Sequence, residues 1–262
     1  MNIKMKALVA VAVAAMSISG VASAALDSGA AGNSSLVLTL LDRNSSASAT
    51  FDLGFTYSSF SAGGSDSSVS FNWNLGSGDY AAAWNEFFSL ADANSVVWNI
   101  SAGDNLGLNT EVGTKGFITT TREGAAVPEI VRTVQISGAA TAFDKYVEAN
   151  KALGNHADVE NGASVATNGS AYASVFLNGN KFSNIGPLAT SALDTEQGVV
   201  QYVTGLGSTG YVTPSIYDAT FRLGADGLLT YTVAAVPEPE TYALLLAGLG
   251  LVGAAARRRK SA

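Results

Sequence analysis

YDATFRLGADGLLTYTV, residues 217–233, decides how the body of this chain folds. Two β-prone runs, 217–223 and 228–233, flank the four residues Gly224-Ala225-Asp226-Gly227. An Asp-Gly pair between such runs is a strong signal for a β-hairpin, because these residues accept the backbone angles of its tight turn. The stretch therefore predicts two antiparallel strands that end close to Val236.

Short runs upstream of this hairpin show the same β character. Residues 96–101 alternate so that Val96, Trp98 and Ile100 would face a core. Further strands are predicted at 36–41, 49–53, 69–73, 171–177 and 198–204. Turns rich in Gly, Ser and Asn separate these runs.

Two segments depart from the strand pattern and predict helices. Asp79 is placed to cap the first helix and Thr141 the second, which Gly154 would end. Their apolar stripes at helical spacing are Tyr80, Trp84, Phe87, Phe88 and Ala91 in the first, and Phe143, Tyr146, Val147 and Leu153 in the second. Aromatic stripes serve core packing or carbohydrate stacking, and core packing is the commoner use.

Together these elements predict a mainly β fold over residues 36–235, a β-sandwich or jelly-roll-like domain with two inserted helices. Residues 25–35 are rich in Ala, Ser, Gly and Asn and predict a flexible leader. The 262 residues are 47% hydrophobic and include no cysteine, so the core must be stable without disulfides. The lack of cysteine also excludes thiol chemistry and cysteine-ligated metals.

The N-terminus has the pattern of a secretory signal peptide over residues 1–24. A basic start with Lys4 and Lys6 precedes an apolar run at 7–16, and Ala22 and Ala24 frame a small-residue cleavage site. The apolar run is shorter than the about 20 residues of a spanning helix, which disfavours a permanent anchor. The sequence therefore predicts export, with cleavage after Ala24.

The charge of the body is strongly acidic. Residues 25–235 contain 8 basic and 19 acidic side chains, a formal charge of −11. A surface of this sign repels phosphate backbones, so nucleic-acid binding is not expected.

The C-terminal segment, 236–262, has the composition of a membrane stop. Residues 241–256 carry no charge, and as a helix they would extend about 24 Å, which is marginal for a bilayer core of about 30 Å, so the flanking residues must help. The cations Arg257, Arg258, Arg259 and Lys260 would stay on the cytoplasmic side. A buried amphipathic helix is the alternative, but 243–252 has no polar face.

A proline-bracketed peptide precedes this predicted transmembrane helix. A residue before proline is pushed toward extended backbone, so Val236 and Glu238 should both be extended. Pro239 suits the first turn of the following helix, where its missing N–H costs nothing. The peptide is therefore a stiff handle for a processing enzyme.

The order of Pro237-Glu238-Pro239, apolar stretch and basic end resembles the PEP-CTERM sorting signal of Gram-negative bacteria. The resemblance covers about 25 residues, and it implies recognition by an exosortase-like enzyme of the inner membrane in bacteria that make extracellular polysaccharide. The body more loosely resembles PEP-CTERM proteins of unknown activity. A second Val-Pro-Glu, Val127-Pro128-Glu129, lacks the following proline and apolar run.

Candidate catalytic groups are few in this chain. His156 is the only histidine, and its place after Gly154-Asn155 predicts a surface loop or helix-end role. No Gly-x-Ser-x-Gly is present to build a serine triad on it, and neither nucleotide-binding fingerprint occurs in context.

Carboxylates and calcium ligands are the remaining options. A glycosidase needs two nearby carboxylates, and Asp158 with Glu160 or Asp194 with Glu196 are candidates that we expect to be solvated. Asp92-Ala93-Asn94 and Asp226-Gly227 offer oxygens but lack the calcium-loop pattern, and turn formation explains them. No catalytic residue, metal or other cofactor is therefore expected.

These features predict a non-enzymatic exported protein, anchored to the inner membrane as a precursor and then released to the cell surface or extracellular matrix. Its role there would be structural or adhesive, in an exopolysaccharide or biofilm matrix. The alternatives are a carbohydrate-binding or carbohydrate-active module, which a concave aromatic cleft with paired carboxylates would favour, and a protein that stays anchored by an uncut helix.

Overall fold

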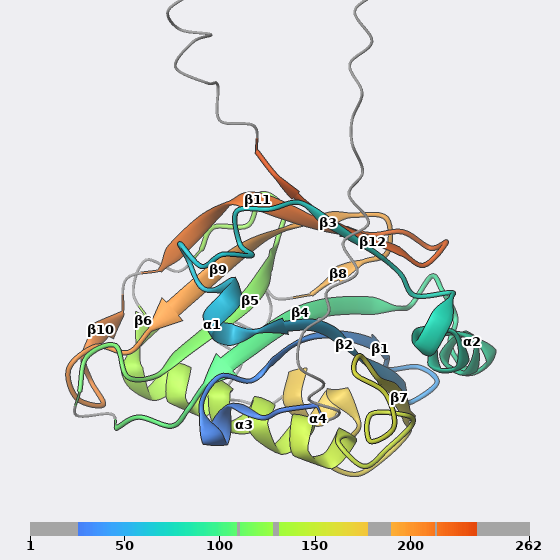
Figure 1. Cartoon of the computed structure of the whole chain (residues 1–262), viewed down its shortest axis with the longest axis horizontal. Helices are drawn as coiled ribbons and strands as arrows, with labels where there is room; N and C mark the ends of the chain where they lie inside the picture. The colour runs from blue at the N-terminus through green and yellow to red at the C-terminus, as the bar shows by residue number, and fades with distance from the viewer. Residues whose placement is uncertain (1–25, 109–110, 128–130, 178–189, 213, 235–262) are drawn as a thin grey trace, which may run out of the picture.

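The computed structural model of the chain describes residues 26–108, 111–127, 131–177, 190–212 and 214–234. Within these ranges the strands form one ten-stranded antiparallel sheet in the order β3-β12-β11-β9-β5-β4-β1-β2-β7, with β8 paired to β4 (Figure 1). Two further strands, β6 and β10, form a small separate sheet.

The elements have the following bounds. The strands of the main sheet are β1 Ser35–Asp42, β2 Ala47–Thr56, β3 Phe71–Asn74, β4 Val97–Asp104, β5 Gly116–Arg122, β7 Ala163–Ala166, β8 Ser191–Ala192, β9 Glu196–Val203, β11 Ser215–Leu223 and β12 Leu228–Val233. The small sheet pairs β6 Val131–Arg132 with β10 Tyr211–Val212. The helices are α1 Tyr57–Phe60, α2 Ala81–Leu90, α3 Thr133–Asn150 and α4 Ala173–Leu177, with short 3-10 turns η1 Gly29–Ala31 and η2 Gly78–Tyr80.

Strand β1 is buried along its whole length because both faces of the sheet carry a core. Leu36, Leu38 and Leu40 belong to the core on one face, whereas Val37 and Leu41 belong to the core on the other. Successive side chains of a strand point to opposite faces, so a strand between two cores carries apolar side chains on both of its faces.

The first core, which we call the inner core, lies where the sheet curls back on itself. Figure 1 shows β11, β12 and β3 curling over β4, β1 and β2. Phe60 of α1 contacts Tyr231 of β12 with ring centroids 4.9 Å apart, and Trp84 and Phe87 of α2 close one end. The strands thus follow one continuous hydrogen-bonded path, and the predicted arrangement of two stacked sheets is not observed.

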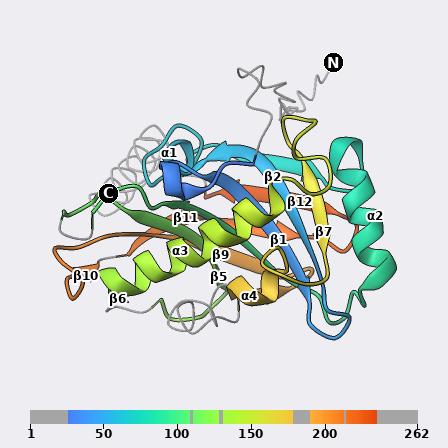
Figure 2. The same ribbon diagram turned by 90° about the horizontal axis from the view of Figure 1, so that it is seen from below.

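The second core, the outer core, lies between the opposite face of the sheet and two helices. Figure 2 shows α3 crossing this face with α4 beside it. Phe143 of α3 meets Phe117 of β5 edge to face, with centroids 5.7 Å apart. Tyr146 stacks on Phe176 of α4 at 5.4 Å. Aromatic pairs of this geometry stabilise a core beyond the area that they bury.

The predicted hairpin is present as β11 and β12. Phe221 pairs with Tyr231, and the Gly224 amide donates to the Leu228 carbonyl over 3.0 Å. Gly227 has φ +84°, a left-handed value that favours glycine. Strands predicted at 36–41, 49–53, 69–73, 96–101 and 198–204 correspond to β1, β2, β3, β4 and β9.

Both predicted helices exist, but their predicted starts are wrong. Asp79 lies in η2, and the residue that precedes α2 is Tyr80. Helix α3 begins at Thr133, where the Gln135 side-chain oxygen accepts from the Arg132 amide over 2.6 Å. Thr141 therefore lies inside α3 and donates its hydroxyl to the Ser137 carbonyl. The helix ends at Asn150, before Gly154.

Two further segments differ from prediction. The strand expected at 171–177 contains helix α4, because Ala173, Phe176 and Leu177 share one helical face and bury it in the outer core. The leader expected to be flexible is packed from Leu26 onward. Leu26 is 1% exposed, and Ser28 donates a 2.5 Å hydrogen bond to Glu148 of α3.

No helix in the described ranges is both long enough and apolar enough to cross a membrane. The transmembrane helix predicted at 241–256 lies outside the described residues.

Candidate functional site

The sorting residues predicted from the sequence lie outside the described part of the chain. They are Ala22 and Ala24 at the signal cleavage site, Pro237, Glu238 and Pro239 in the handle, and Arg257, Arg258, Arg259 and Lys260 at the end. The structure does describe the residues that precede the handle in the chain, up to Ala234. Strand β12 ends at Val233, and the Ala234 amide is bonded to the Asp218 carbonyl, so the handle follows an ordered sheet.

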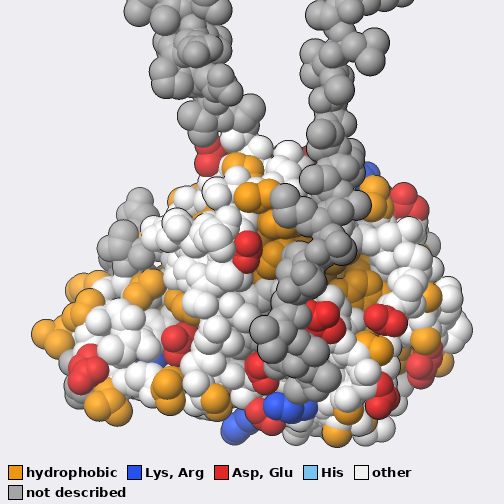
Figure 3. All heavy atoms as spheres, viewed as in Figure 1, with side chains coloured by type: hydrophobic (Ala, Val, Ile, Leu, Met, Phe, Trp, Pro, Cys, Tyr) orange, Lys and Arg blue, Asp and Glu red, His pale blue; other side chains and the backbone are white. Residues whose placement is uncertain are grey.

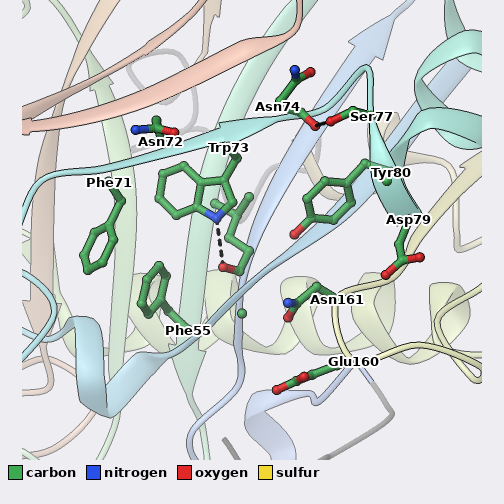
Figure 4. A pocket seen from close by; sticks show the side chains of 13 residues that line it. Phe55, Phe71, Asn72, Trp73, Asn74, Ser77, Asp79, Tyr80, Glu160 and Asn161 are labelled. Atoms are coloured by element: carbon green, nitrogen blue, oxygen red, sulfur yellow. Dashed lines mark hydrogen bonds between the residues drawn. The ribbon is translucent and has the colours of Figure 1, made fainter. Parts of the chain in front are cut away.

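A cleft of about 410 Å³ opens beside β3 and is the candidate ligand site of the body. We call it the β3 cleft. Its lining comes from the end of β2, from β3 and η2, and from the loop before β7 (Figure 4). The lining residues are Leu53, Gly54, Phe55, Phe71, Asn72, Trp73, Asn74, Ser77, Gly78, Asp79, Tyr80, Glu160 and Asn161. Figure 3 shows hydrophobic side chains gathered on this side of the molecule.

One wall of the β3 cleft is aromatic. Strand β3 alternates so that Phe71 and Trp73 are half-buried while Asn72 and Asn74 are exposed, and Figure 4 shows the two amides directed away from the rings. Phe55 of β2 lies beneath both rings, with centroids 4.6 Å from Phe71 and 5.8 Å from Trp73. This wall is therefore supported from behind by the inner core.

Hydrogen bonds hold the polar ends of two of these rings. The Trp73 indole N–H donates to the Leu53 carbonyl over 3.0 Å, and the Tyr80 hydroxyl donates to the Asp52 carbonyl. Burial, with the nearby Asp52 and Asp79 charges, raises the pKa of Tyr80. The donors of both rings are thus used inside the protein, and the two half-buried rings line the cleft with apolar carbon atoms.

The facing wall is polar. Asp79 and Glu160 are exposed and Asn161 is half-buried. Within the described part of the chain, none of the three side chains has a hydrogen bond or ion pair to another residue. Their oxygens and the Asn161 amide are free to bind a ligand.

Asn155 and Gly54 position this polar wall. The Asn155 side chain donates to the Asp79 carbonyl over 2.8 Å and accepts from the Ala163 amide over 2.7 Å, which joins the loop before β7 to η2. Gly54 has φ +77°, and a Cβ there would lie 2.8 Å from the Asn161 side-chain oxygen. Glycine at this position therefore leaves room for the Asn161 side chain.

Asp52 lies behind the β3 cleft and is 5% exposed. Its carboxylate accepts from the Ser35 hydroxyl over 2.9 Å and from the Gly54 amide over 3.0 Å. Burial raises the pKa of Asp52 to about 6, and the charges of Asp27 and Glu160 add to the increase. No local sequence pattern marks Asp52, because its burial depends on contacts between segments far apart in the chain.

His156 is buried, and the predicted surface loop position is wrong. It is 1% exposed, its Nε2 lies 3.2 Å from the Ser164 hydroxyl, and its Nδ1 has no hydrogen-bond partner among the described residues. Ser164 in turn donates to the Asn150 side chain over 2.9 Å. The Ser164 hydroxyl is thus hydrogen-bonded to an amide and buried from solvent, so a substrate cannot reach it as a nucleophile.

The carboxylate pairs expected to be solvated are exposed. Asp158 and Glu160 are both exposed, although Glu160 alone belongs to the β3 cleft. Asp194 and Glu196 are also exposed, and Asp194 forms an ion pair with Arg222 at 2.9 Å.

The aspartates considered as possible calcium ligands accept hydrogen bonds within turns. Asp92 accepts from the Asn94 amide over 3.0 Å, and Asp226 accepts from the Leu228 amide over 3.1 Å. In the described ranges, no group of three or more His, Asp or Glu side chains is arranged to hold a metal ion.

The sequence contained a partial signal for the β3 cleft. Phe71-x-Trp73 alternates with asparagines in a predicted strand, and Tyr80 starts the first aromatic stripe. Trp84 and Phe87 of that stripe pack in the inner core, as expected, whereas Tyr80 turns toward the cleft (Figure 4). The contribution of Glu160 and Asn161 follows from the long-range pairing of β2 with β7.

Comparison with known proteins identifies one segment of the chain. No curated protein and no solved structure matches the chain. A family model described as the PEP-CTERM protein-sorting motif matches residues 235–260, which include the Pro-Glu-Pro handle, the apolar stretch and the basic end. The chain therefore carries a C-terminal PEP-CTERM sorting motif, the signal by which an exosortase-like system directs a protein to the exterior of the cell.

Proposed function

We propose that this protein is a non-catalytic component of the cell surface or extracellular matrix, where it acts as a structural or adhesive protein in exopolysaccharide. The sorting motif at 235–260 is the observation that carries this proposal. Residues 241–256 would hold the precursor in the inner membrane while an exosortase-like enzyme cuts near Pro237. The folded body would then be released on the outer side.

The junction between body and motif supports this order of events. Strand β12 ends at Val233, where its amide is bonded to the Ser70 hydroxyl, and the motif match begins at residue 235. Val236 and Glu238 each precede a proline, which would favour an extended backbone in the handle next to this strand. The enzyme would therefore meet the handle at a fixed place next to the body.

The chemistry of the described residues favours a non-catalytic role. The only histidine, His156, is buried and bonded to Ser164. The cleft carboxylates Asp79 and Glu160 are both exposed, whereas a glycosidase acid needs an environment that keeps it protonated. Binding without turnover is the simpler use of this arrangement.

A second candidate function, carbohydrate binding, is favoured by the β3 cleft. Its aromatic wall and its unpaired polar wall suit the two faces of a sugar ring, one formed by C–H groups and one edged by hydroxyls. Such binding would also explain retention in a polysaccharide matrix. The two candidates are therefore compatible.

The sorting proposal is tested by reading both ends of the protein recovered from cells that have an exosortase. Mass spectrometry of the wild type should give an N-terminus at Ala25 and a C-terminus near Pro237, with the protein outside the membrane fraction. The triple variant Pro237→Ala, Glu238→Ala, Pro239→Ala should keep residues 241–262 and remain with the membrane.

The matched control is Pro128→Ala with Glu129→Ala, which alters the second Val-Pro-Glu and should be processed like the wild type. If the triple variant is processed and released like the wild type, the enzyme does not read this motif and the sorting proposal is wrong. Release of reducing ends from a matrix polysaccharide by the processed protein would contradict the non-catalytic role.

A further inference from the structure

We infer that the β3 cleft binds a neutral polysaccharide, a chain of hexoses without carboxylate or sulfate groups. This inference rests on the proposed carbohydrate-binding function and names its ligand class. The aromatic wall would contact the C–H face of a sugar ring, and the polar wall would bind its hydroxyls.

The aromatic wall is organised for contact with a flat apolar face. Trp73 and Tyr80 both use their polar atoms for hydrogen bonds inside the protein, to the Leu53 and Asp52 carbonyls. The part of each ring that faces the cleft therefore offers a π face and no donor. The negative π face attracts the slightly positive C–H groups of a sugar, and these fixed rings lose little conformational entropy on binding.

The polar wall has the complementary property. Asp79 and Glu160 carry only acceptors when ionised, and Asn161 adds an amide with both donors and an acceptor. Sugar hydroxyls donate and accept, so neighbouring hydroxyls satisfy a carboxylate with charge-assisted hydrogen bonds. None of the three side chains has to break a hydrogen bond within the described part of the chain in order to bind.

Charge determines which sugars fit. Of the residues that the structure describes, two carboxylates and no lysine or arginine line the cleft, and the buried Asp52 lies behind it. The whole body carries a formal charge of −11. A uronic acid or a sulfated sugar would bring a further negative charge next to Asp79 and Glu160 without a compensating cation. The cleft therefore selects against acidic polysaccharides.

The size of the cleft also fits a short stretch of such a chain. Its volume of about 410 Å³ lies at the small end of the range of ligand sites, about 300–1,000 Å³. Because Asp79 and Glu160 are exposed, the polar wall is open to solvent, and a longer chain can leave the cleft there.

The test is affinity electrophoresis of the processed protein in gels that contain a neutral β-glucan or polygalacturonate, each at matched mass and low salt. The wild type should be retarded by the glucan and not by polygalacturonate. Trp73→Ala should weaken glucan binding at least tenfold. Tyr211→Ala, which removes an aromatic ring that is 66% exposed on β10, is the matched control and should bind like the wild type.

A second variant keeps the test decisive if Trp73→Ala fails to fold, since Trp73 also packs on Phe55. Asp79→Asn with Glu160→Gln changes two exposed, unpaired side chains and should leave the melting temperature unchanged. It should weaken glucan binding about tenfold through the loss of charge-assisted hydrogen bonds, and it should bind polygalacturonate better than the wild type does.

The outcomes separate the two proposals. If the wild type binds neither polysaccharide, carbohydrate binding itself is wrong. If it binds polygalacturonate as well as the glucan, the protein binds carbohydrate but the inferred preference is overturned. Glucan binding that persists unchanged in a folded Trp73→Ala protein and in the Asp79→Asn, Glu160→Gln protein would place the binding site elsewhere.

Discussion

Two buried ionisable side chains link the stability of the body to pH in opposite directions. His156 and Asp52 are 1% and 5% exposed. Burial lowers the pKa of His156 to about 4 and raises that of Asp52 to about 6. In both cases burial favours the neutral form, which is the basic form for histidine and the acidic form for aspartate.

We expect the His156 contribution to disappear in acid. The unfolded chain takes up a proton at this histidine near its usual pKa of 6.5, whereas the folded chain resists until about pH 4. The stabilisation is therefore complete above pH 6.5 and is lost as the pH falls toward 4, by up to about 3 kcal/mol. In urea unfolding between pH 4 and 7, His156→Gln should lose less stability on acidification than the wild type. An identical pH dependence in the two proteins would contradict this.

Asp52 should behave in the opposite way. Its carboxyl ionises near pH 3.8 in the unfolded chain but only near pH 6 in the folded one, so its favourable contribution is present below 3.8 and is lost as the pH rises through 6. The unfavourable effect at pH 7 is about 3 kcal/mol. Asp52→Asn removes the titration and should become more stable relative to the wild type as the pH rises from 4 to 7. Asp158→Asn, at an exposed position, is the control and should follow the wild type.

The β11–β12 hairpin shows how a turn residue also serves packing between elements. Gly227 ends the turn with φ +84°, and a Cβ there would lie 3.2 Å from the indole ring of Trp84 in α2. The turn therefore lies directly against the helix that closes one end of the inner core. Any side chain at this position meets both a backbone penalty and a steric one.

Gly227→Ala is expected to destabilise the protein by about 2 kcal/mol or more in urea unfolding, from the left-handed backbone and the collision with Trp84. Gly124→Ala is the matched control, because Gly124 has φ +68° with no atom within 4 Å of a new Cβ. It should lose about 1 kcal/mol from the backbone alone. Equal losses in the two variants would show that the hairpin does not press on α2.

In the molecule as a whole, the single sheet joins two cores that share its central strands. Val37 and Leu38 are neighbours in β1, yet one packs in the outer core with α3 and the other in the inner core. A strand cannot leave one core without exposing the other. We therefore expect the body to unfold as one cooperative unit.

Phe143→Ala tests this coupling. Phe143 is fully buried on α3 between Phe117 and Phe176, so its truncation should destabilise the protein by about 3–5 kcal/mol. All three tryptophans, Trp73, Trp84 and Trp98, belong to or pack on the inner core, so their fluorescence reports on the other face of the sheet. The unfolding transitions monitored by tryptophan fluorescence and by far-UV circular dichroism should shift together to a lower urea concentration.

Val134→Ala, on the same helix but 52% exposed, is the control and should change stability by less than about 0.5 kcal/mol. If Phe143→Ala lowers the urea midpoint of the dichroism transition and leaves the midpoint of the fluorescence transition unchanged, the two cores unfold independently.

Features of this protein that depend on neighbouring residues could be predicted from the sequence. Alternation within 96–101 was enough to place Val96, Trp98 and Ile100 in a core, and the Asp-Gly turn was enough for the β11–β12 hairpin. The sorting motif was also readable, because its three parts act in their linear order. Hydrophobic periodicity and turn-forming residues are local features, so they can be recognised without knowledge of the fold.

Features that depend on contacts between distant residues could not be predicted from the sequence and became visible in the folded molecule. The strands form one curled sheet because of long-range pairings such as that of β3 with β12. The same region brings the Tyr231 hydroxyl to the Ser67 carbonyl, 164 residues away in the chain. The same curl assembled the β3 cleft and buried Asp52, and the loop beside β7 enclosed His156. The burial of a residue and the assembly of a cleft both depend on contacts between segments far apart in the chain. Local sequence patterns do not indicate which of these segments will meet.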